Sequence, residues 1–112
     1  MSRDKALLLD ILLAARDAIS YVEGLDREGF MESKLHQDAV VRALEVVGEA
    51  AQKVSDQGKK AAPDIPWRQI TGMRNRLIHE YFRVDLEEVW DTVQTSIPEL
   101  ITKIEPLVPP EE

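Results

Sequence analysis

Apolar residues recur at the spacing of an α-helix along almost the whole chain, and no run alternates with period two for long enough to predict a strand. The first apolar stripe consists of Leu8, Leu12, Ala15, Ile19 and Val22. Gly24 follows this stripe at the position where a glycine C-cap is expected. A short helical turn through Phe30 and Met31 is predicted next, opening near Asp26.

A second long helix is predicted from the stripe Val40, Leu44, Val47, Ala51 and Val54. Gly48 lies inside this helix, where a glycine costs about 1 kcal/mol relative to alanine. The close approach of another helix would explain a glycine at this position. The helical pattern then breaks between Ser55 and Pro66, a segment that contains Gly58 and two prolines.

Pro66 suits the first turn of a third helix, because the N–H that proline lacks would have no partner there. This helix is predicted from about Trp67 to Phe82, and Asp85 with Glu88 matches the capping pattern of a fourth. The buried stripe of the fourth helix is Val89, Val93, Ile97, Leu100 and Ile104. Pro98 should kink it. The fold class predicted is therefore all-α, an up-and-down bundle of four main helices with a short extra helical turn.

Both long N-terminal helices carry apolar arcs wider than one bundle core requires. A second stripe lies beside the first in each, made of Leu7, Ile11, Ala14, Ala18 and Tyr21, and of Ala39, Ala43, Val46 and Ala50. Alanines are tolerated on any face of a helix, which is one explanation. The other is a second buried contact, for which a symmetric homodimer is the simplest arrangement. We expect the homodimer.

The chain has 112 residues, which favours one domain, here predicted over residues 1–105 with a frayed Pro/Glu tail at 106–112. It has no cysteine and no apolar run of the roughly 20 residues that a membrane helix needs. We therefore expect a cytoplasmic protein with no membrane segment. Its net charge of −7, taken alone, argues against binding to nucleic acid.

Residues 66–83 change that interpretation. The stretch from Arg68 to Arg83 contains four arginines, one glutamate and His79, so it carries a local charge of +3 against −10 for the rest of the chain. Arginine binds phosphate with a planar fork of donors and stays protonated. A histidine can transfer a proton near neutral pH. Together they supply what phosphoryl-transfer chemistry without a metal requires.

The spacing of these residues limits how they can meet. Asn75 and His79 are four residues apart and share a helix face. Arg74 and His79 are five apart, which is about 140° around an ideal helix. They can act on one phosphate only if the helix loosens near His79 or if the two residues pair across a dimer. In either case we expect the site at a helix end that faces a groove.

The run Arg74-Asn75-Arg76-Leu77-Ile78-His79 resembles the R-x(4–6)-H motif of the HEPN superfamily, and Tyr81 extends it to the R-x(4)-H-x-Y form of HepT-like toxins. The resemblance covers about residues 4–105. It includes the segments Asp38–Arg42, Gly48–Ala50, Pro66–Arg68 and Leu86–Trp90.

This resemblance implies a HEPN-like homodimer that is a metal-independent endoribonuclease and needs no cofactor, with both copies of the motif facing one cleft. His79 would be the general acid or base, Arg74 would neutralise the phosphate, and Asn75 would position His79 or a phosphate oxygen. The implied products are a 2′,3′-cyclic phosphate and a 5′-hydroxyl. The chain would be the toxin of a toxin–antitoxin pair, inactivated when a nucleotidyltransferase antitoxin of the MntA type adenylylates Tyr81.

Alternatives remain for several of these residues. Arg74 can instead form a structural bridge to Glu49, and Tyr81 can pack as an ordinary aromatic. Arg42 and Arg68 can extend an RNA track or pair with acids. Arg76 and Arg83 fit an exposed ion-pair face with Glu80. The rival function is a non-catalytic, nucleotide- or protein-binding helical subunit of a nucleotidyltransferase complex.

Overall fold

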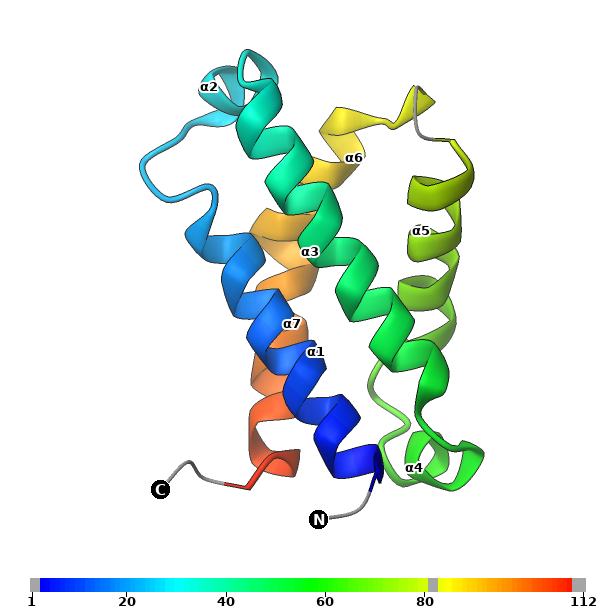
Figure 1. Cartoon of the computed structure of the whole chain (residues 1–112). Helices are drawn as coiled ribbons and strands as arrows, with labels where there is room; N and C mark the ends of the chain where they lie inside the picture. Colours follow the sequence, from blue (N-terminus) through cyan, green and yellow to red (C-terminus); the bar gives the residue numbers. More distant parts are fainter. Residues whose placement is uncertain (1–2, 81–82, 110–112) are drawn as a thin grey trace.

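The computed structural model describes residues 3–80 and 83–109, and every regular element within these ranges is helical. In chain order they are α1 (Arg3–Ser20), α2 (Arg27–Met31), α3 (Lys34–Lys53), α4 (Asp56–Ala61), α5 (Trp67–His79), α6 (Leu86–Asp91), η2 (Thr92–Ser96), α7 (Ile97–Ile104) and η3 (Glu105–Leu107). Helices α1, α3, α5 and the α6–α7 unit run alternately up and down (Figure 1). The predicted all-α, four-helix, up-and-down bundle is confirmed.

The helix boundaries follow local chemistry. Gly24 adopts a φ of 78° in the turn after α1, a conformation that residues with a Cβ rarely adopt. The side chain of Asp26 accepts a hydrogen bond from the backbone N–H of Gly29 at 2.7 Å and so caps the predicted short helix. Asp85 caps α6 by accepting from the backbone N–H groups of Glu87 and Glu88.

The segment predicted as a break between Ser55 and Pro66 contains a short helix, α4. The Ser55 hydroxyl caps it by accepting from the backbone N–H of Gly58 at 3.0 Å. The carboxylate of Asp4 in turn accepts from the Ser55 backbone N–H at 3.0 Å, which ties the start of α1 to the end of α3. The hydrogen bonds from Ser55 lower the pKa of Asp4.

The predicted disruption at Pro98 takes the form of one π-helical turn, η2, between α6 and α7. Proline has no N–H to donate and its ring crowds the carbonyl four residues earlier, so the regular helix cannot continue through it. The backbone N–H of Ile97 bonds instead to the carbonyl of Thr92, five residues back. Pro98 then lies in the first turn of α7, where no donor is needed.

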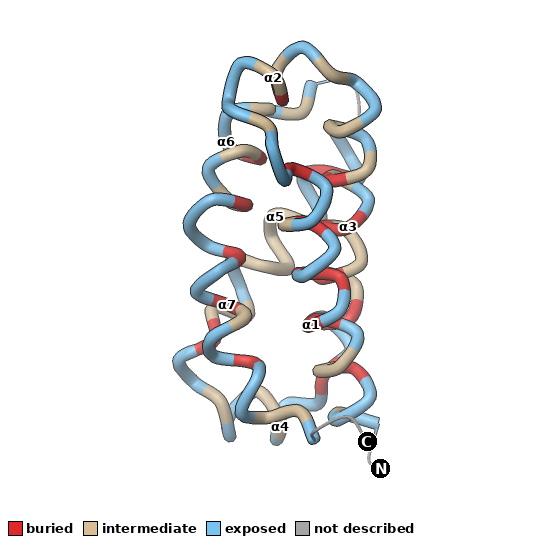
Figure 2. Tube along the Cα trace, turned by 90° about the vertical axis from the view of Figure 1, so that its left-hand side faces the viewer, coloured by how far each residue is buried: buried red, intermediate tan, exposed pale blue. Residues whose placement is uncertain are grey.

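The core lies between α1, α3 and the C-terminal α6–α7 unit, and buried residues occupy the inward sides of these helices (Figure 2). The stripes predicted for the second and fourth helices are buried throughout: Val40, Leu44, Val47, Ala51, Val54, Val89, Val93, Ile97, Leu100 and Ile104. In α1 the buried face straddles the two neighbouring stripes, so Leu8 and Ile19 are only half-buried. Leu13 of α1 and Tyr21, in the turn after α1, remain exposed, at 42% and 39%.

Helix α5 is held mainly by α3, and Gly48 is the point of closest approach. A Cβ added to Gly48 would lie 2.1 Å from the Cβ of Arg74 and 2.7 Å from its Cγ. No side chain larger than hydrogen fits there without moving α5. The close helix contact predicted for Gly48 is therefore confirmed, and the residue that approaches it is the arginine of the motif.

Replacing Gly48 with alanine should destabilise the protein by about 1–3 kcal/mol, because the methyl group overpacks the contact between α3 and α5. Gly72→Ala is the matched control within α5. A Cβ at Gly72 would have only the Arg76 Nη1 within 4 Å, at 3.8 Å, and alanine is the better helix former, so this variant should gain up to about 1 kcal/mol. Urea unfolding measures both. Equal midpoints for the two variants would contradict the close contact.

Candidate active site

The arginine-rich segment forms α5, which buries little of its surface. Leu77 is its only residue classed as buried, while Ile70 and Met73 pack against the core at half-burial. The helix begins at Trp67, as predicted, with Pro66 as its N-cap, but it ends at His79, before the predicted end at Phe82, with Glu80 as its C-cap. The remaining faces of α5 carry polar and charged side chains, so the helix presents its arginines and His79 to the surface.

Arg74 is the half-buried member of this set, with a side chain that is 24% exposed. Its aliphatic stem lies against Gly48 of α3. Its Nη1 donates to the Oδ1 of Asn75 at 2.9 Å, and its Nη2 lies 4.0 Å from the Oε1 of Glu49. Its Nε is buried and has no hydrogen-bond partner within the described part of the chain. The guanidinium is thus held at its edge by two neighbours on different helices.

His79 is the last residue of α5, and its side chain is exposed. The helix stays regular up to this point, because the N–H of Glu80 still bonds to the carbonyl of Arg76 at 2.9 Å. The loosening that would bring His79 round to Arg74 is therefore absent from α5 as described. The placement expected at a helix end is confirmed for His79.

One chain thus brings Arg74 together with Asn75, and Asn75 lies one turn before His79 on the exposed side of α5. Arg74 and His79 themselves leave the helix about 140° apart, the separation expected for five residues of regular helix. Ile78 lies between them at 36% exposure. Tyr81, the predicted modification site, and Phe82, the predicted helix end, lie outside the described residues.

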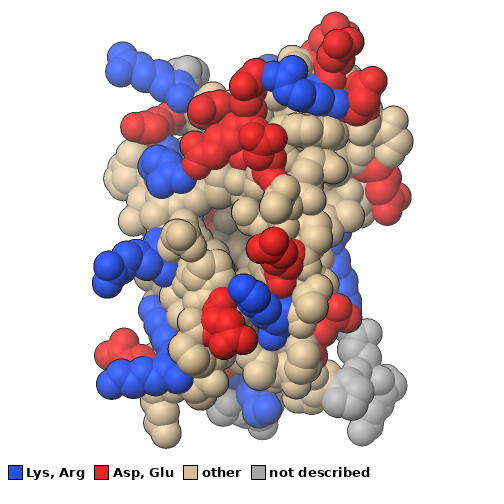
Figure 3. Space-filling view, turned by 180° about the vertical axis from the view of Figure 1, so that it is seen from behind, with Lys and Arg blue, Asp and Glu red and all other residues tan. Residues whose placement is uncertain are grey.

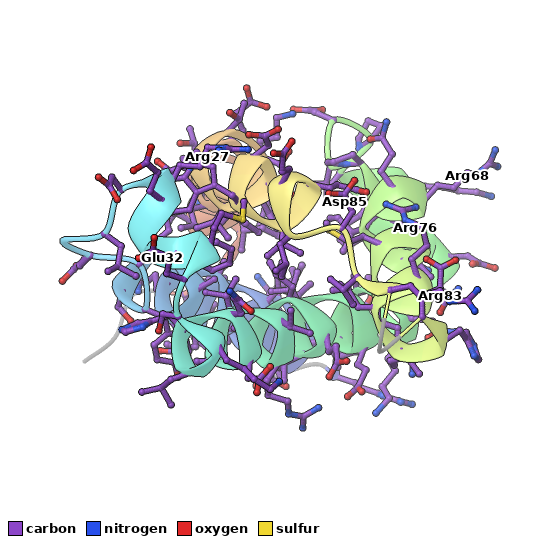
Figure 4. All side chains as sticks on the ribbon, turned by 90° about the horizontal axis from the view of Figure 1, so that it is seen from above. Arg27, Glu32, Arg68, Arg76, Arg83 and Asp85 are labelled. Carbon is purple, nitrogen blue, oxygen red and sulfur yellow. The ribbon has the colours of Figure 1, made fainter. Side chains whose placement is uncertain are left out.

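The other arginines have separate environments. Arg76 forms an ion pair with Glu88 of α6 rather than with Glu80, so the expected pairing along α5 is wrong for Arg76. Figure 4 shows Arg76 on the side of α5 that faces α6, and Arg68 pointing away from the bundle. Arg42 of α3 lies 3.7 Å from Glu45 and 3.9 Å from Glu49, which places it among acids.

The Arg76–Glu88 pair lies at the rim of a groove of about 350 Å³ between α5 and the C-terminal helices. Core residues of α3, α5 and α7 line its walls, including Leu44, Met73 and Leu100. The site was expected to face a groove, but neither Arg74 nor His79 lines this one. The groove forms where α5 packs on α3 and the side of α5 towards α7 stays uncovered. It lies on the side of α5 away from the contact between Arg74 and Glu49.

Charge on the molecular surface follows the division noted in the sequence. Seen from behind, basic side chains line the edge formed by α5 and α4, while acidic side chains gather over α6 (Figure 3). No cluster of three or more His, Cys, Asp or Glu among the described residues could hold a metal ion. No helix within the same residues is long and apolar enough to cross a membrane.

Sequence reasoning had identified Arg74, Asn75 and His79, and Glu49 only as a structural alternative for Arg74. It missed that Glu49 lies between Arg42 and Arg74 and so joins two helices. The available signal was the dipeptide Gly48-Glu49. Where a glycine allows another helix to approach closely, the residue next to the glycine lies near that helix. Glu49 therefore lies near Arg74 of α5.

The all-helical bundle agrees with the HEPN-like fold expected from the sequence. Residues 11–107 match the family described as Ribonuclease HepT-like. The chain belongs to this family.

Individual relatives agree with this assignment. The protein of Thermococcus cleftensis named "Probable ribonuclease HepT" is 42% identical over 102 residues, which cover 88% of this chain and 93% of its own length. "Putative RNase MJ0125" of Methanocaldococcus jannaschii is 40% identical over 104 residues, with 93% and 90% covered. A second protein of that organism, "Putative RNase MJ1380", is 37% identical over 101 residues, with 90% and 93% covered. No solved structure matched the chain.

Proposed function

We propose that this protein is a metal-independent endoribonuclease, the toxin of a toxin–antitoxin pair, and that Arg74 and His79 cut the RNA. The observation that carries the proposal is the R-x4-H sequence on the exposed end of α5, in a chain whose relatives bear ribonuclease names. An arginine held against a second helix and an exposed histidine one turn from Asn75 fit the two roles that the reaction requires.

The chemistry follows from those groups. The ribose 2′-hydroxyl attacks the adjacent phosphorus, the bond to the 5′-oxygen breaks, and a 2′,3′-cyclic phosphate and a 5′-hydroxyl remain. His79 takes the proton from the 2′-hydroxyl or gives one to the leaving oxygen. Arg74 stabilises the negative charge that builds on the phosphate oxygens in the transition state. Asn75 orients Arg74 through the hydrogen bond between them.

The active form is a homodimer in this proposal. A regular α5 separates Arg74 from His79, so the two residues converge on one phosphate when a second copy presents its own α5. Exposed apolar side chains support an additional contact surface. Leu13 of α1 and Tyr21 just after α1 line a shallow groove together with Ala39 and Val46 of α3.

The proposed control is adenylylation of Tyr81 by a nucleotidyltransferase antitoxin of the MntA type. Tyr81 follows His79 by two residues, so an AMP group there would add bulk and negative charge beside the position proposed for the RNA phosphate. Binding of RNA would then be opposed by repulsion as well as by occlusion.

Arg74→Ala and His79→Ala should each lower the rate of RNA cleavage by at least about 100-fold, because each removes a group that acts on the reacting phosphate. The assay is cleavage of a labelled RNA in the presence of EDTA, with product ends identified by mass spectrometry. Arg68→Ala is the control, since it removes the same charge from the other end of α5 and Arg68 points away from the bundle (Figure 4).

Variants of Arg74 and His79 that cut RNA as fast as the natural protein would contradict the catalytic assignment. A natural protein that binds a nucleotide or the nucleotidyltransferase tightly but cuts no RNA would instead favour the non-catalytic subunit. The ion pair between Arg74 and Glu49 is the observation that favours this second function.

Co-expression with the nucleotidyltransferase should add one or more AMP groups to the chain, and Tyr81→Phe should prevent the addition, because phenylalanine lacks the accepting hydroxyl. Intact-mass spectrometry measures the addition, and the cleavage assay measures its effect. Tyr21→Phe is the matched control, since Tyr21 is an exposed tyrosine in the turn after α1. Equal AMP addition to the Tyr81→Phe variant would contradict the assignment of the site.

A further inference from the structure

The surroundings of Arg74 contain a charged residue to which the reaction scheme gives no role. Glu49 follows Gly48 on α3, and its carboxylate lies 4.0 Å from Arg74 and 3.9 Å from Arg42. Its side chain is 37% exposed, so it lies at the surface where α3 meets α5. We infer that Glu49, together with Gly48, is a positioning residue that fixes the guanidinium of Arg74 for the reaction; this inference rests on the proposed ribonuclease function.

Gly48 fixes the stem of the arginine. The missing Cβ leaves room for the Cβ and Cγ of Arg74 directly on the backbone of α3. Because the Cβ and Cγ of Arg74 pack against the backbone at Gly48, the first side-chain torsion of Arg74 is restricted. An exposed arginine would keep this freedom. The remaining freedom is in the outer torsions that carry the guanidinium.

Glu49 and Asn75 restrict those outer torsions from two sides. The Oδ1 of Asn75 accepts from Nη1, while the carboxylate of Glu49 attracts Nη2. Arginine donates through five N–H groups in a plane, so two neighbours at its terminal nitrogens set the orientation of that plane. The Nε is turned inward and buried. The terminal nitrogens are therefore the part of Arg74 that remains for a phosphate.

Arg42 keeps Glu49 in place. It lies on the same helix, seven residues earlier, and its Nη1 approaches both Glu45 and Glu49. The carboxylate of Glu49 thus lies between two positively charged guanidinium groups. Attraction to both groups restrains the flexible side chain of Glu49. The gap of 4.0 Å to Arg74 is at the upper limit of an ion pair, which suits an arginine that must also bind substrate.

The alternative is that Glu49 masks Arg74 by occupying the place of the phosphate. The two interpretations predict opposite changes in the rate of RNA cleavage. A positioning role predicts slower cleavage when the charge on Glu49 is removed, because the orientation of the guanidinium matters most in the transition state. A masking role predicts faster cleavage and tighter RNA binding.

The test compares Glu49→Gln with Glu45→Gln. Both substitutions remove one negative charge from α3, and both affected side chains pair with Arg42, but only Glu49 pairs with Arg74. We expect Glu49→Gln to lower kcat by at least about tenfold and to change KM by less than about twofold. A misoriented guanidinium stabilises the transition state less, while it affects binding of the substrate little. Glu45→Gln should stay within about twofold of the natural protein in both constants.

A second readout does not depend on activity. The buried Nε–H of Arg74 should give a resolved ¹H–¹⁵N resonance, identified by its loss in Arg74→Lys. We expect this resonance to broaden or shift in Glu49→Gln and to stay in place in Glu45→Gln. Circular dichroism and urea unfolding check that both variants are folded.

Equal kcat values for the two glutamine variants, or faster cleavage by Glu49→Gln, would overturn the positioning role while leaving the ribonuclease function standing. If the natural protein cuts no RNA, the proposed function fails, and the arginine resonance still reports whether Glu49 orients Arg74. An unchanged resonance in Glu49→Gln would then overturn the inference.

Discussion

The arrangement of the candidate site depends on the contact between Gly48 and Arg74. Helix α5 has a single buried residue, Leu77, and is held mainly by α3, so its position is set by how closely the two helices approach. A hydrogen atom at position 48 lets the stem of Arg74 lie on the backbone of α3. With α5 in this position, Arg74 is half-buried beside Glu49, and a groove opens on the side of α5 towards α7. His79 leaves the helix about 140° from Arg74 and is exposed.

The distribution of charge matters more for the proposed function than the total charge of the chain. A charge of −7 spread evenly over the surface would repel RNA. Here the positive charge is concentrated on one helix that stands at the edge of the bundle, and acidic side chains gather over the neighbouring α6 (Figure 3). Separation of positive from negative charge allows a phosphate to meet arginine locally, and under the proposed function the acidic remainder should limit binding of RNA elsewhere.

Much of this could be predicted from the sequence because it depends on local pattern. The stripes of the second and fourth helices, the caps at Asp26 and Asp85, and the disruption at Pro98 each follow from a few neighbouring residues. Features that depend on pairs of distant residues were harder. Helix α4 was missed because its cap, Ser55, is itself held by Asp4, 51 residues away. Arg76 was assigned to Glu80 on its own helix, but Glu88 of α6 is its partner. Gly48 predicted a close contact with another helix, but the sequence alone could not identify Arg74 as the residue that makes it.

A regular α5 keeps Arg74 and His79 of one copy apart, so we propose that the active cleft combines residues from two copies. Subunit complementation tests it most directly: Arg74→Ala and His79→Ala chains are co-expressed with different tags, and the mixed dimer is assayed for RNA cleavage. If each catalytic pair takes its arginine from one copy and its histidine from the other, the mixed dimer retains one of its two Arg74–His79 pairs intact. The mixed dimer, isolated through both tags, should then show about half of the natural activity. A mixed dimer as inactive as either variant alone would contradict the account.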